Sequence, residues 1–234
     1  MKFKNFFLII FCAIFWGCSG RKNISDFQEV IGQHYIAHAG GTIQGFRYSN
    51  CLEAVSEALM HDFLYIELDL CLTADSQLVA WHDWNWQWTF TPTYEQFMSH
   101  KVYDRFTPID FKKIDSIMAN NPNLSLVTDK ISDPAIIDHY FHSYKQRVWV
   151  ECFTDDDYFA LQQMGYHVLA SKDPPTNYSP IGNYTFNRYS CSNPSIRYGA
   201  CFAIYGGDIS CTMADSIFAI DERIRFVYVD NYNK

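Results

Sequence analysis

The chain has 234 residues, of which 48% are hydrophobic and 19% are charged. This balance is typical of a globular protein and excludes a disordered or fibrous chain. There are 18 lysine and arginine residues against 26 aspartate and glutamate residues, so the formal net charge is −8. A net negative surface repels phosphate backbones, and we therefore expect no nucleic-acid partner.

The amino terminus is typical of an export signal. Lys2 and Lys4 precede an apolar run from Phe6 to Trp16, which is too short to span a bilayer as a helix. Gly17 and Cys18 then resemble a bacterial lipobox, in which the cysteine is lipidated and becomes the first residue of the mature protein. The alternative is a plain secretory signal that is cleaved nearby, with Cys18 incidental.

The lipobox divides the chain into three parts. We predict a lipoprotein signal peptide over 1–17, a polar tether over 18–33 and one domain over 34–234. The protein would then belong to the bacterial cell envelope, either anchored to the membrane through lipid on Cys18 or periplasmic. The sequence does not indicate the oligomeric state of the protein.

Export also bears on the cysteines, because an exported chain lives where disulfides are permitted. Cys191, Cys201 and Cys211 fall in a loop-rich region, where one bridge among them is plausible. Cys71 and Cys152 lie in strand-like runs, and we expect them to be buried thiols.

Beyond the tether, strand-like and helix-like segments alternate. The predicted strands cover 35–38, 63–72, 78–81, 124–128, 147–153, 167–170, 200–205 and 225–229. The predicted helices cover 50–61, 109–120, 134–144, 155–165 and 213–221. Eight strands interleaved with helices favour a parallel sheet and, at this length, a compact single-domain (β/α)₈ TIM barrel. An open doubly wound sheet is the alternative, but Gly40-Gly41 is a weak signal for its phosphate loop.

Polar side chains stand on the first four predicted strands, near their carboxyl ends. His38 ends the first strand, and Glu67 and Asp69 lie two apart on the second, so they share a face. His82 ends the third strand and Asp129 the fourth. Barrel active sites lie at the carboxyl ends of strands, so we expect these side chains to converge.

This set of side chains indicates a metal-assisted reaction. Three converging carboxylates, from Glu67, Asp69 and Asp129, would repel one another without a cation. Their hard oxygen ligands suit one divalent ion, Ca²⁺ or Mg²⁺, better than zinc. Two imidazoles beside that ion, from His38 and His82, predict a general acid and a general base that flank a phosphorus centre.

Ordered motifs in the first half carry a family resemblance. The chain contains His38-Ala39-Gly40-Gly41, Ser49-Asn50-Cys51-Leu52-Glu53-Ala54, Glu67-Leu68-Asp69, Thr73-Ala74-Asp75-Ser76 and His82-Asp83. This order resembles the glycerophosphodiester phosphodiesterases of the phosphatidylinositol phospholipase C-like phosphodiesterase superfamily, with patterns like H-R-G, E-N-T-x-x-A, E-x-D, T-x-D-G and H-D. The similarity is dense over about 34–83 and weaker through Asp129-Lys130 and the ending Phe226 to Asn231. It is nearest to a divergent bacterial branch.

The resemblance implies a metal-dependent phosphoric diester hydrolase. Its substrates would be glycerophosphodiesters or related phospholipid head-group phosphodiesters, as small molecules or derived from lipid. His38 and His82 would be the paired acid and base, and Glu67 and Asp69 would be metal ligands.

Two departures from the family pattern affect this assignment. The third ligand in the family is usually a Glu two residues before a Lys, and Thr128 occupies that position, so we assign the neighbouring Asp129 instead. Ala39 stands where the family commonly has an arginine that holds phosphate, and losing a guanidinium weakens phosphate capture. Another cation would have to substitute, and the candidates are Lys130, Lys172 and Arg47.

Aromatic residues make up 18% of the chain, and tryptophans in particular are dense beside His82. Trp81, Trp84, Trp86 and Trp88 are four of the six tryptophans. We predict that Trp84 and Trp86 contact substrate as a lid that stacks on a polyol head group or touches lipid. The alternative is that the rings pack the barrel mouth. If the segment were extended, Trp84, Trp86 and Trp88 would share one face.

Two other functions fit parts of the pattern. A catalytically impaired envelope lipoprotein could bind a phosphorylated ligand or a protein partner, which would explain Ala39. A barrel glycosidase could use Glu67 as acid or nucleophile, although two carboxylates two apart on one strand suit a metal better.

Overall fold

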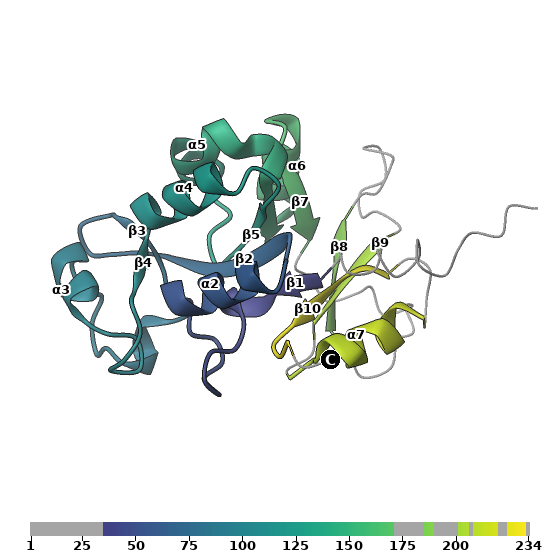
Figure 1. The fold of residues 1–234 in the computed structure, drawn as a ribbon. Helices are drawn as coiled ribbons and strands as arrows, with labels where there is room; N and C mark the ends of the chain where they lie inside the picture. The colour runs from purple at the N-terminus through teal and green to yellow at the C-terminus, as the bar shows by residue number, and fades with distance from the viewer. Residues whose placement is uncertain (1–34, 171–184, 190–200, 206–207, 220–223, 233–234) are drawn as a thin grey trace, which may run out of the picture.

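The strands of the protein form a closed ring. The computed structural model describes residues 35–170, 185–189, 201–205, 208–219 and 224–232 (Figure 1). The first strand pairs with the second on one side and with the last on the other, which closes the sheet. In ring order the strands are β1 (Tyr35–Ala37), β2 (Tyr65–Leu72), β5 (Ser125–Asp129), β6 (Val148–Cys152), β7 (His167–Ala170), β8 (Thr185–Tyr189), β9 (Cys201–Tyr205) and β10 (Ile224–Val229). The predicted α/β barrel is confirmed.

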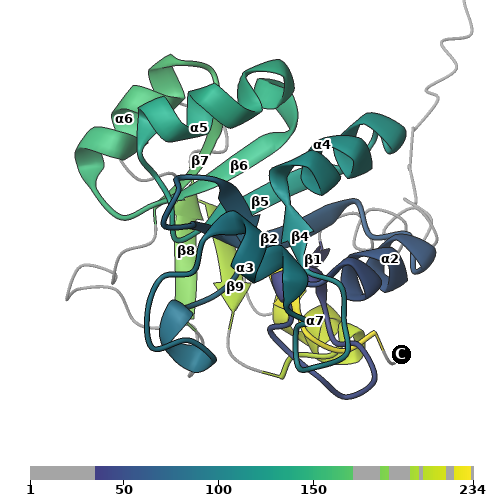
Figure 2. The ribbon, with the colours of Figure 1, turned by 90° about the vertical axis from the view of Figure 1, so that its left-hand side faces the viewer.

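Helices cover the outside of the ring (Figures 1 and 2). They are α2 (Leu52–Met60), α4 (Phe111–Asn120), α5 (Pro134–Phe141), α6 (Asp155–Gln163) and α7 (Cys211–Phe218). The starts of α4 to α7 follow from capping residues, because the side chains of Asp110, Asp133, Thr154 and Ser210 each accept a hydrogen bond from a backbone N–H of the first turn.

The apolar core has two layers, which follow the alternation of side chains along each strand. Inside the ring lie Ile36, Val127, Leu169, Phe226 and Tyr228, all buried. Between the ring and the helices lies a larger cluster that includes Leu68, Leu126 and Phe141. The lower barrel is therefore filled with side chains, and a site can form only at its mouth.

The third predicted strand is not part of the ring, which corrects the expectation. Strand β3 (Leu78–Ala80) pairs antiparallel with β2, and β4 (Ile109–Asp110) pairs antiparallel with β3. The reason is the turn over 73–77, which is closed by a hydrogen bond from Thr73 N to Gln77 O (3.0 Å). Such a turn is too short for a parallel crossover, which needs a dozen or more residues.

The expectation of a wholly parallel sheet is also wrong at one strand. Strand β8, which the sequence analysis missed, completes the ring and runs antiparallel to both β7 and β9. Its sequence includes Asn187 and Arg188 and so lacks the continuous apolar run that is typical of barrel strands.

Several smaller differences concern helix ends. Helix α4 begins at Phe111 because Ile109–Asp110 pairs with β3. Helix α5 ends at Phe141, and the 3₁₀ segment η3 (His142–Arg147) follows it. Helix α3 (Tyr94–Ser99), which was not predicted, begins at a capping box formed by Thr93 and Gln96.

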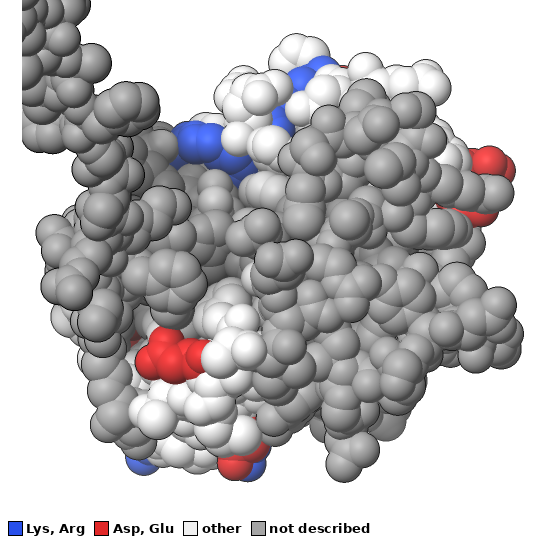
Figure 3. All heavy atoms as spheres, turned by 90° about the vertical axis from the view of Figure 1, so that its right-hand side faces the viewer, with Lys and Arg blue, Asp and Glu red and all other residues white. Residues whose placement is uncertain are grey.

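The terminal and surface features complete this description. The predicted signal peptide, tether and Cys18 lie outside the described residues, and so does Cys191, so the predicted disulfide stays a prediction. Cys152 is a buried thiol and Cys71 a half-buried one. Among the described helices, none is long and apolar enough to cross a bilayer. On the face in Figure 3, the coloured charged side chains appear in small separate groups.

Candidate functional site

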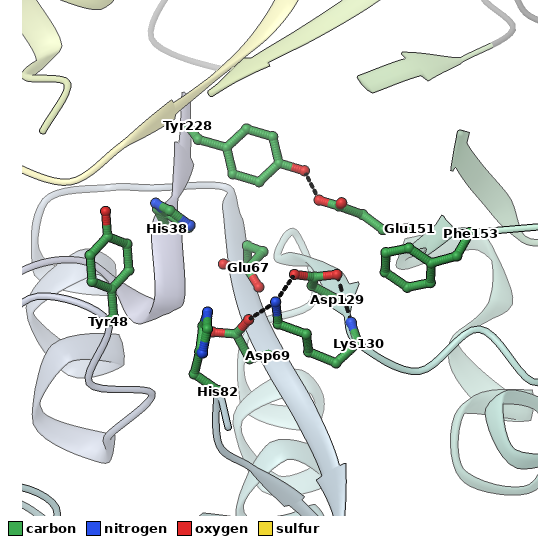
Figure 4. A pocket seen from close by; sticks show the side chains of 10 residues that line it. All are labelled: His38, Tyr48, Glu67, Asp69, His82, Asp129, Lys130, Glu151, Phe153 and Tyr228. Atoms are coloured by element: carbon green, nitrogen blue, oxygen red, sulfur yellow. Dashed lines mark hydrogen bonds and ion pairs between the residues drawn. The ribbon is translucent and has the colours of Figure 1, made fainter. Parts of the chain in front are cut away.

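A cavity of about 370 Å³ opens at the carboxyl ends of the strands (Figure 4). Its lining contains both predicted catalytic histidines, all three predicted metal ligands and Lys130. The lining residues are His38, Tyr48, Glu67, Asp69, His82, Asp129, Lys130, Glu151, Phe153 and Tyr228. The structure therefore brings together six of the predicted site residues from separate parts of the chain.

Strand register explains why three carboxylates meet. Asp69 on β2 and Asp129 on β5 are partners in the parallel ladder, so their side chains stand side by side on the inner face. Glu67 lies two residues before Asp69 and shares that face. One oxygen from each of the three carboxylates lies within 4.8 Å of the others.

The same register explains why Asp129, and not position 128, joins the cluster. Thr128 pairs with Leu68, whose side chain packs in the layer between the ring and the helices. Residue 128 therefore faces away from the barrel interior, and Asp129 faces into it.

Neutral donors hold two of the carboxylates in place. The backbone N–H of Ala39 donates to Glu67 Oε2 (2.7 Å). The Asn50 side chain binds Asp69 twice: its Nδ2 donates to Asp69 Oδ2 (2.8 Å) and its Oδ1 accepts from Asp69 N (2.9 Å). Glu67 and Asp69 are also buried, so these hydrogen bonds and the surrounding packing together fix the positions of their carboxylates.

The electrostatics of the cluster favour a bound cation. Burial, together with the charges of Asp69 and Asp129, raises the pKa of Glu67 well above its usual range. Burial also raises the pKa of Asp69, although the hydrogen bond from Asn50 opposes this. Both shifts show that negative charge is unfavourable at this place without a positive partner.

Lys130 supplies part of that positive charge. Its Nζ lies 3.3 Å from Asp129 Oδ2 and 3.8 Å from Asp69 Oδ1 (Figure 4). Burial alone would lower the pKa of Lys130, but Asp129 and Asp69 outweigh it and raise the pKa. One ammonium group faces three carboxylates, so Lys130 leaves the cluster with excess negative charge.

The donor atoms present fit a divalent cation. Glu67 Oε1 is buried and has no hydrogen-bond partner among the described residues. A buried carboxylate oxygen without a partner is costly, and a cation beside it would remove that cost. The three carboxylates offer only hard oxygen ligands, which suit Ca²⁺ or Mg²⁺.

His38 is held by a buried carboxylate. Ala37 on β1 and Val229 on β10 are register partners. The residues that follow them, His38 and Asp230, therefore lie side by side. His38 Nδ1 lies 3.0 Å from Asp230 Oδ1. Because a carboxylate only accepts, this contact places a proton on Nδ1 and leaves Nε2 for the cavity. The other Asp230 oxygen accepts from Ile209 N (3.1 Å).

His82 reaches the cavity from outside the ring, because it follows β3. Its ring stacks on Trp86, with ring centroids 4.3 Å apart and planes inclined by 14°. Its Nδ1 is buried and has no hydrogen-bond partner in the described part of the chain. The two histidines are therefore held in different ways.

The other tryptophans of this segment mainly pack. Residues 84–86 form a 3₁₀ turn, so the extended arrangement with three rings on one face does not occur. Trp84 stacks on Trp81 and meets Phe97 edge to face, and it is not among the residues that line the cavity. Trp88 contacts Phe90 and His100.

Sequence analysis missed several site residues. Glu151 on β6, Phe153 just after it and Tyr228 on β10 line the cavity, and the Tyr228 hydroxyl donates to Glu151. They lie in or near the final residues of predicted strands, so the strand-end rule that found Asp129 could have found them. Tyr48 and Asn50 lie in a loop, where strand periodicity marks neither of them, although Asn50 belongs to the motif at 49–54 that carries the family resemblance.

The candidate substitutes for the family arginine occupy different places. Ala39 is fully buried and contributes its backbone N–H to Glu67. Arg47 pairs with Asp208 (3.2 Å) and does not line the cavity, and Lys172 lies outside the described residues. Among residues that the structure describes, Lys130 is the lysine or arginine that lines the cavity.

Comparison with solved structures supports the fold. A glycerophosphoryl diester phosphodiesterase domain from Mycobacterium tuberculosis matches with a TM-score of 0.56 and 13% identity, over 85% of this chain and 96% of that chain. This likeness agrees with the barrel and with the resemblance seen in the sequence, at the level of fold. No protein-family model and no curated protein sequence matches the chain.

Two further phosphodiesterase structures cover less. A glycerophosphodiester phosphodiesterase from Agrobacterium tumefaciens matches with a TM-score of 0.48 and 19% identity, over 58% of this chain and 64% of that one. A glycerophosphoryl diester phosphodiesterase from Parabacteroides distasonis matches with a TM-score of 0.47 and 15% identity, over 60% of this chain and 58% of that one. The chain thus spans less than two thirds of these two proteins.

We predict that Ca²⁺ or Mg²⁺ raises the unfolding temperature of the protein and that Glu67→Gln abolishes most of this rise. A cation that binds only the folded state at 100 times its Kd adds about 2.7 kcal/mol of stability. Differential scanning fluorimetry with each ion and with a chelator measures the effect. Asp156→Asn, at an exposed carboxylate, is the control and should keep the full rise. An equal rise in Glu67→Gln would contradict the site.

Proposed function

We propose that the protein is a metal-dependent phosphoric diester hydrolase that acts on glycerophosphodiesters or related phospholipid head-group phosphodiesters. The observation that carries this proposal is the convergence of two histidines, three carboxylates and one lysine in a single cavity. The likeness in fold to a glycerophosphoryl diester phosphodiesterase domain supports it.

His38 is suited to be the general base. Asp230 accepts a hydrogen bond from the Nδ1–H of His38, so Nε2 carries the lone pair and is free to take up a proton. Nε2 takes a proton from the attacking hydroxyl, while the oxygen of that hydroxyl forms a bond to phosphorus. The attacking group is either a neighbouring hydroxyl of the head group, which gives a cyclic phosphate, or water.

His82 is suited to be the general acid. In Figure 4 it lies beside Asp69, at a place in the cavity distinct from that of His38. As the bond between phosphorus and the leaving oxygen breaks, His82 donates a proton to the leaving alkoxide. A neutral alcohol departs, and the proton count balances the proton that His38 has taken up.

The remaining charged groups bind and orient the phosphate. Glu67, Asp69 and Asp129 would hold the cation, which when bound neutralises negative charge that grows on a phosphate oxygen. The Lys130 ammonium, beside the same carboxylates, can contact a second phosphate oxygen as a point charge. This contact takes over the role of the arginine that is absent at Ala39.

We predict that His38→Ala and His82→Ala each reduce turnover by about 10²-fold or more, because each removes one proton transfer. The assay uses deacylated and acylated phosphodiesters with Ca²⁺, Mg²⁺ or a chelator, and release of the alcohol is measured. His139→Ala, at an exposed histidine, should leave turnover unchanged.

The same assay separates the alternatives. Loss of turnover in chelator supports the proposed reaction. Sugar release that is insensitive to chelator would indicate a glycosidase instead. Binding of a phosphodiester with no turnover by the wild-type protein would indicate a binding protein that has lost catalysis.

We predict that Asp230→Asn lowers kcat by about 10- to 100-fold, because an amide no longer holds the proton on His38 Nδ1 as a carboxylate does. Asp156→Asn is the control, because Asp156 is exposed and does not line the cavity. Thermal unfolding of both variants shows whether the Ile209 contact of Asp230 matters for stability. Unchanged kcat in a folded Asp230→Asn variant would refute the role given to Asp230.

We also propose that the protein is an envelope lipoprotein, anchored through Cys18, whose active site works near the membrane. The support is the basic and apolar pattern of residues 1–17 and the position of Cys18 directly after it. We predict that cells expressing the protein incorporate labelled palmitate into it and that Cys18→Ala loses the label. Label that persists in Cys18→Ala would contradict the anchor.

A further inference from the structure

The segment that follows His82 turns back on itself, so that the indole ring of Trp86 contacts the His82 imidazole. Asp83 starts the turn, since its side chain accepts from Asn85 N (2.9 Å) and its carbonyl accepts from Trp86 N (3.2 Å). The Trp81 indole also donates to the Asp83 carbonyl (2.7 Å). Trp84 is packed against Trp81 and Phe97, so the residues of the turn that precede Trp86 are held in place.

The turn brings Trp86 face to face with His82. Their planes are nearly parallel, with the ring centroids 4.3 Å apart, and the Tyr48 ring meets Trp86 edge to face at 6.4 Å. Asp83 is the nearest carboxylate in sequence, but its side chain is used to cap the turn and not to bind the imidazole.

His82 therefore lacks the kind of support that His38 has. The buried Nδ1 of His82 has no hydrogen-bond partner among the described residues, whereas Asp230 holds Nδ1 of His38. Without a partner on Nδ1, packing against the ring faces is what fixes the rotation of the imidazole. Trp86 supplies the closest of these ring contacts.

We propose that Trp86 is a positioning residue that holds the His82 imidazole by stacking, in place of a carboxylate partner. This inference rests on the proposed function and revises the predicted role of Trp86 as a substrate contact. One face of the indole is occupied by His82, and Trp86 is still 45% exposed.

The experiment compares two leaving groups. A glycerophosphodiester with an alkyl leaving group needs the acid, whereas a nitrophenyl phosphodiester releases a stable anion without protonation. Trp86→Leu removes the stack, and we expect kcat for the alkyl substrate to fall by about 10- to 100-fold. For the nitrophenyl substrate we expect kcat to change little, and Trp86→Phe should restore most of the alkyl activity.

Two further comparisons show whether Trp86 acts through His82. In a His82→Ala background, Trp86→Leu should cause no further loss, because residues that act as one unit are not additive. Phe90→Leu, at an aromatic residue of the same loop that is 54% exposed, should leave both activities unchanged. A higher KM for both substrates, with kcat unchanged, would overturn the proposal in favour of a substrate contact.

NMR separates failure of this inference from failure of the proposed function. The indole ring current should shift the imidazole signals of His82 upfield in the wild-type protein, and Trp86→Leu should remove that shift. If the wild-type protein hydrolyses neither substrate but shows the shift, the proposed function fails while the stack stands. If the His82 signals are the same in Trp86→Leu, the positioning role is overturned even in an active enzyme.

Discussion

The packing of three carboxylates into the mouth of a closed barrel is the constraint on which the rest of the site depends. Asp69 and Asp129 meet because they are register partners on adjacent parallel strands, so no movement of a side chain alone could separate them far. Their proximity raises the free energy of the folded protein unless positive charge and hydrogen-bond donors surround them. The surrounding residues supply part of both.

The backbone shows how the chain meets that requirement. Ala39, Asn50 and Lys130 all touch the cluster, and all three adopt the left-handed conformation, with φ of 49°, 47° and 72°. For residues other than glycine this conformation costs about 1 kcal/mol or more, and such strain persists where the surroundings enforce it. At Ala39 it aims an N–H at Glu67, and at Lys130 it places the ammonium beside the carboxylates of Asp69 and Asp129. Left-handed backbone and the charged cluster therefore meet at these three residues, although loop residues elsewhere, such as Gln44 and Asp104, adopt this conformation too.

The sequence predicts the placement of side chains where that placement follows from strand periodicity. Glu67 and Asp69 share a face because they are two apart. Asp129 was assigned as the carboxylate next to Thr128, and the register explains its inward direction, because alternation sends Thr128 outward. Prediction fails where tertiary contacts decide. The turn over 73–77 redirects the chain into a hairpin, so the predicted strand at 78–81 is a strand that lies outside the ring. The ring strand at 185–189 was missed, and the predicted number of eight ring strands is therefore correct although its members are not. Asn50 and Asp230 were not predicted to act, because their roles depend on contacts far apart in the chain.

Because of the hairpin, the two histidines are supported by different parts of the structure. His38 and Asp230 follow ring strands that pair with each other, so their geometry depends on the barrel itself. His82 follows β3, and its loop rests on a separate apolar cluster that includes Val79, Trp81 and Phe97.

This third apolar cluster contains many of the aromatic residues near His82. Trp84 and Trp88 pack against it, while Trp86 extends beyond it to His82. Loss of packing in the cluster would therefore disturb one histidine and leave the ring and the other histidine in place. Under the proposed function, the barrel would provide the metal ligands and the base, and the hairpin outside the ring would provide the acid. Changes in the loop would then tune the reaction without altering the barrel.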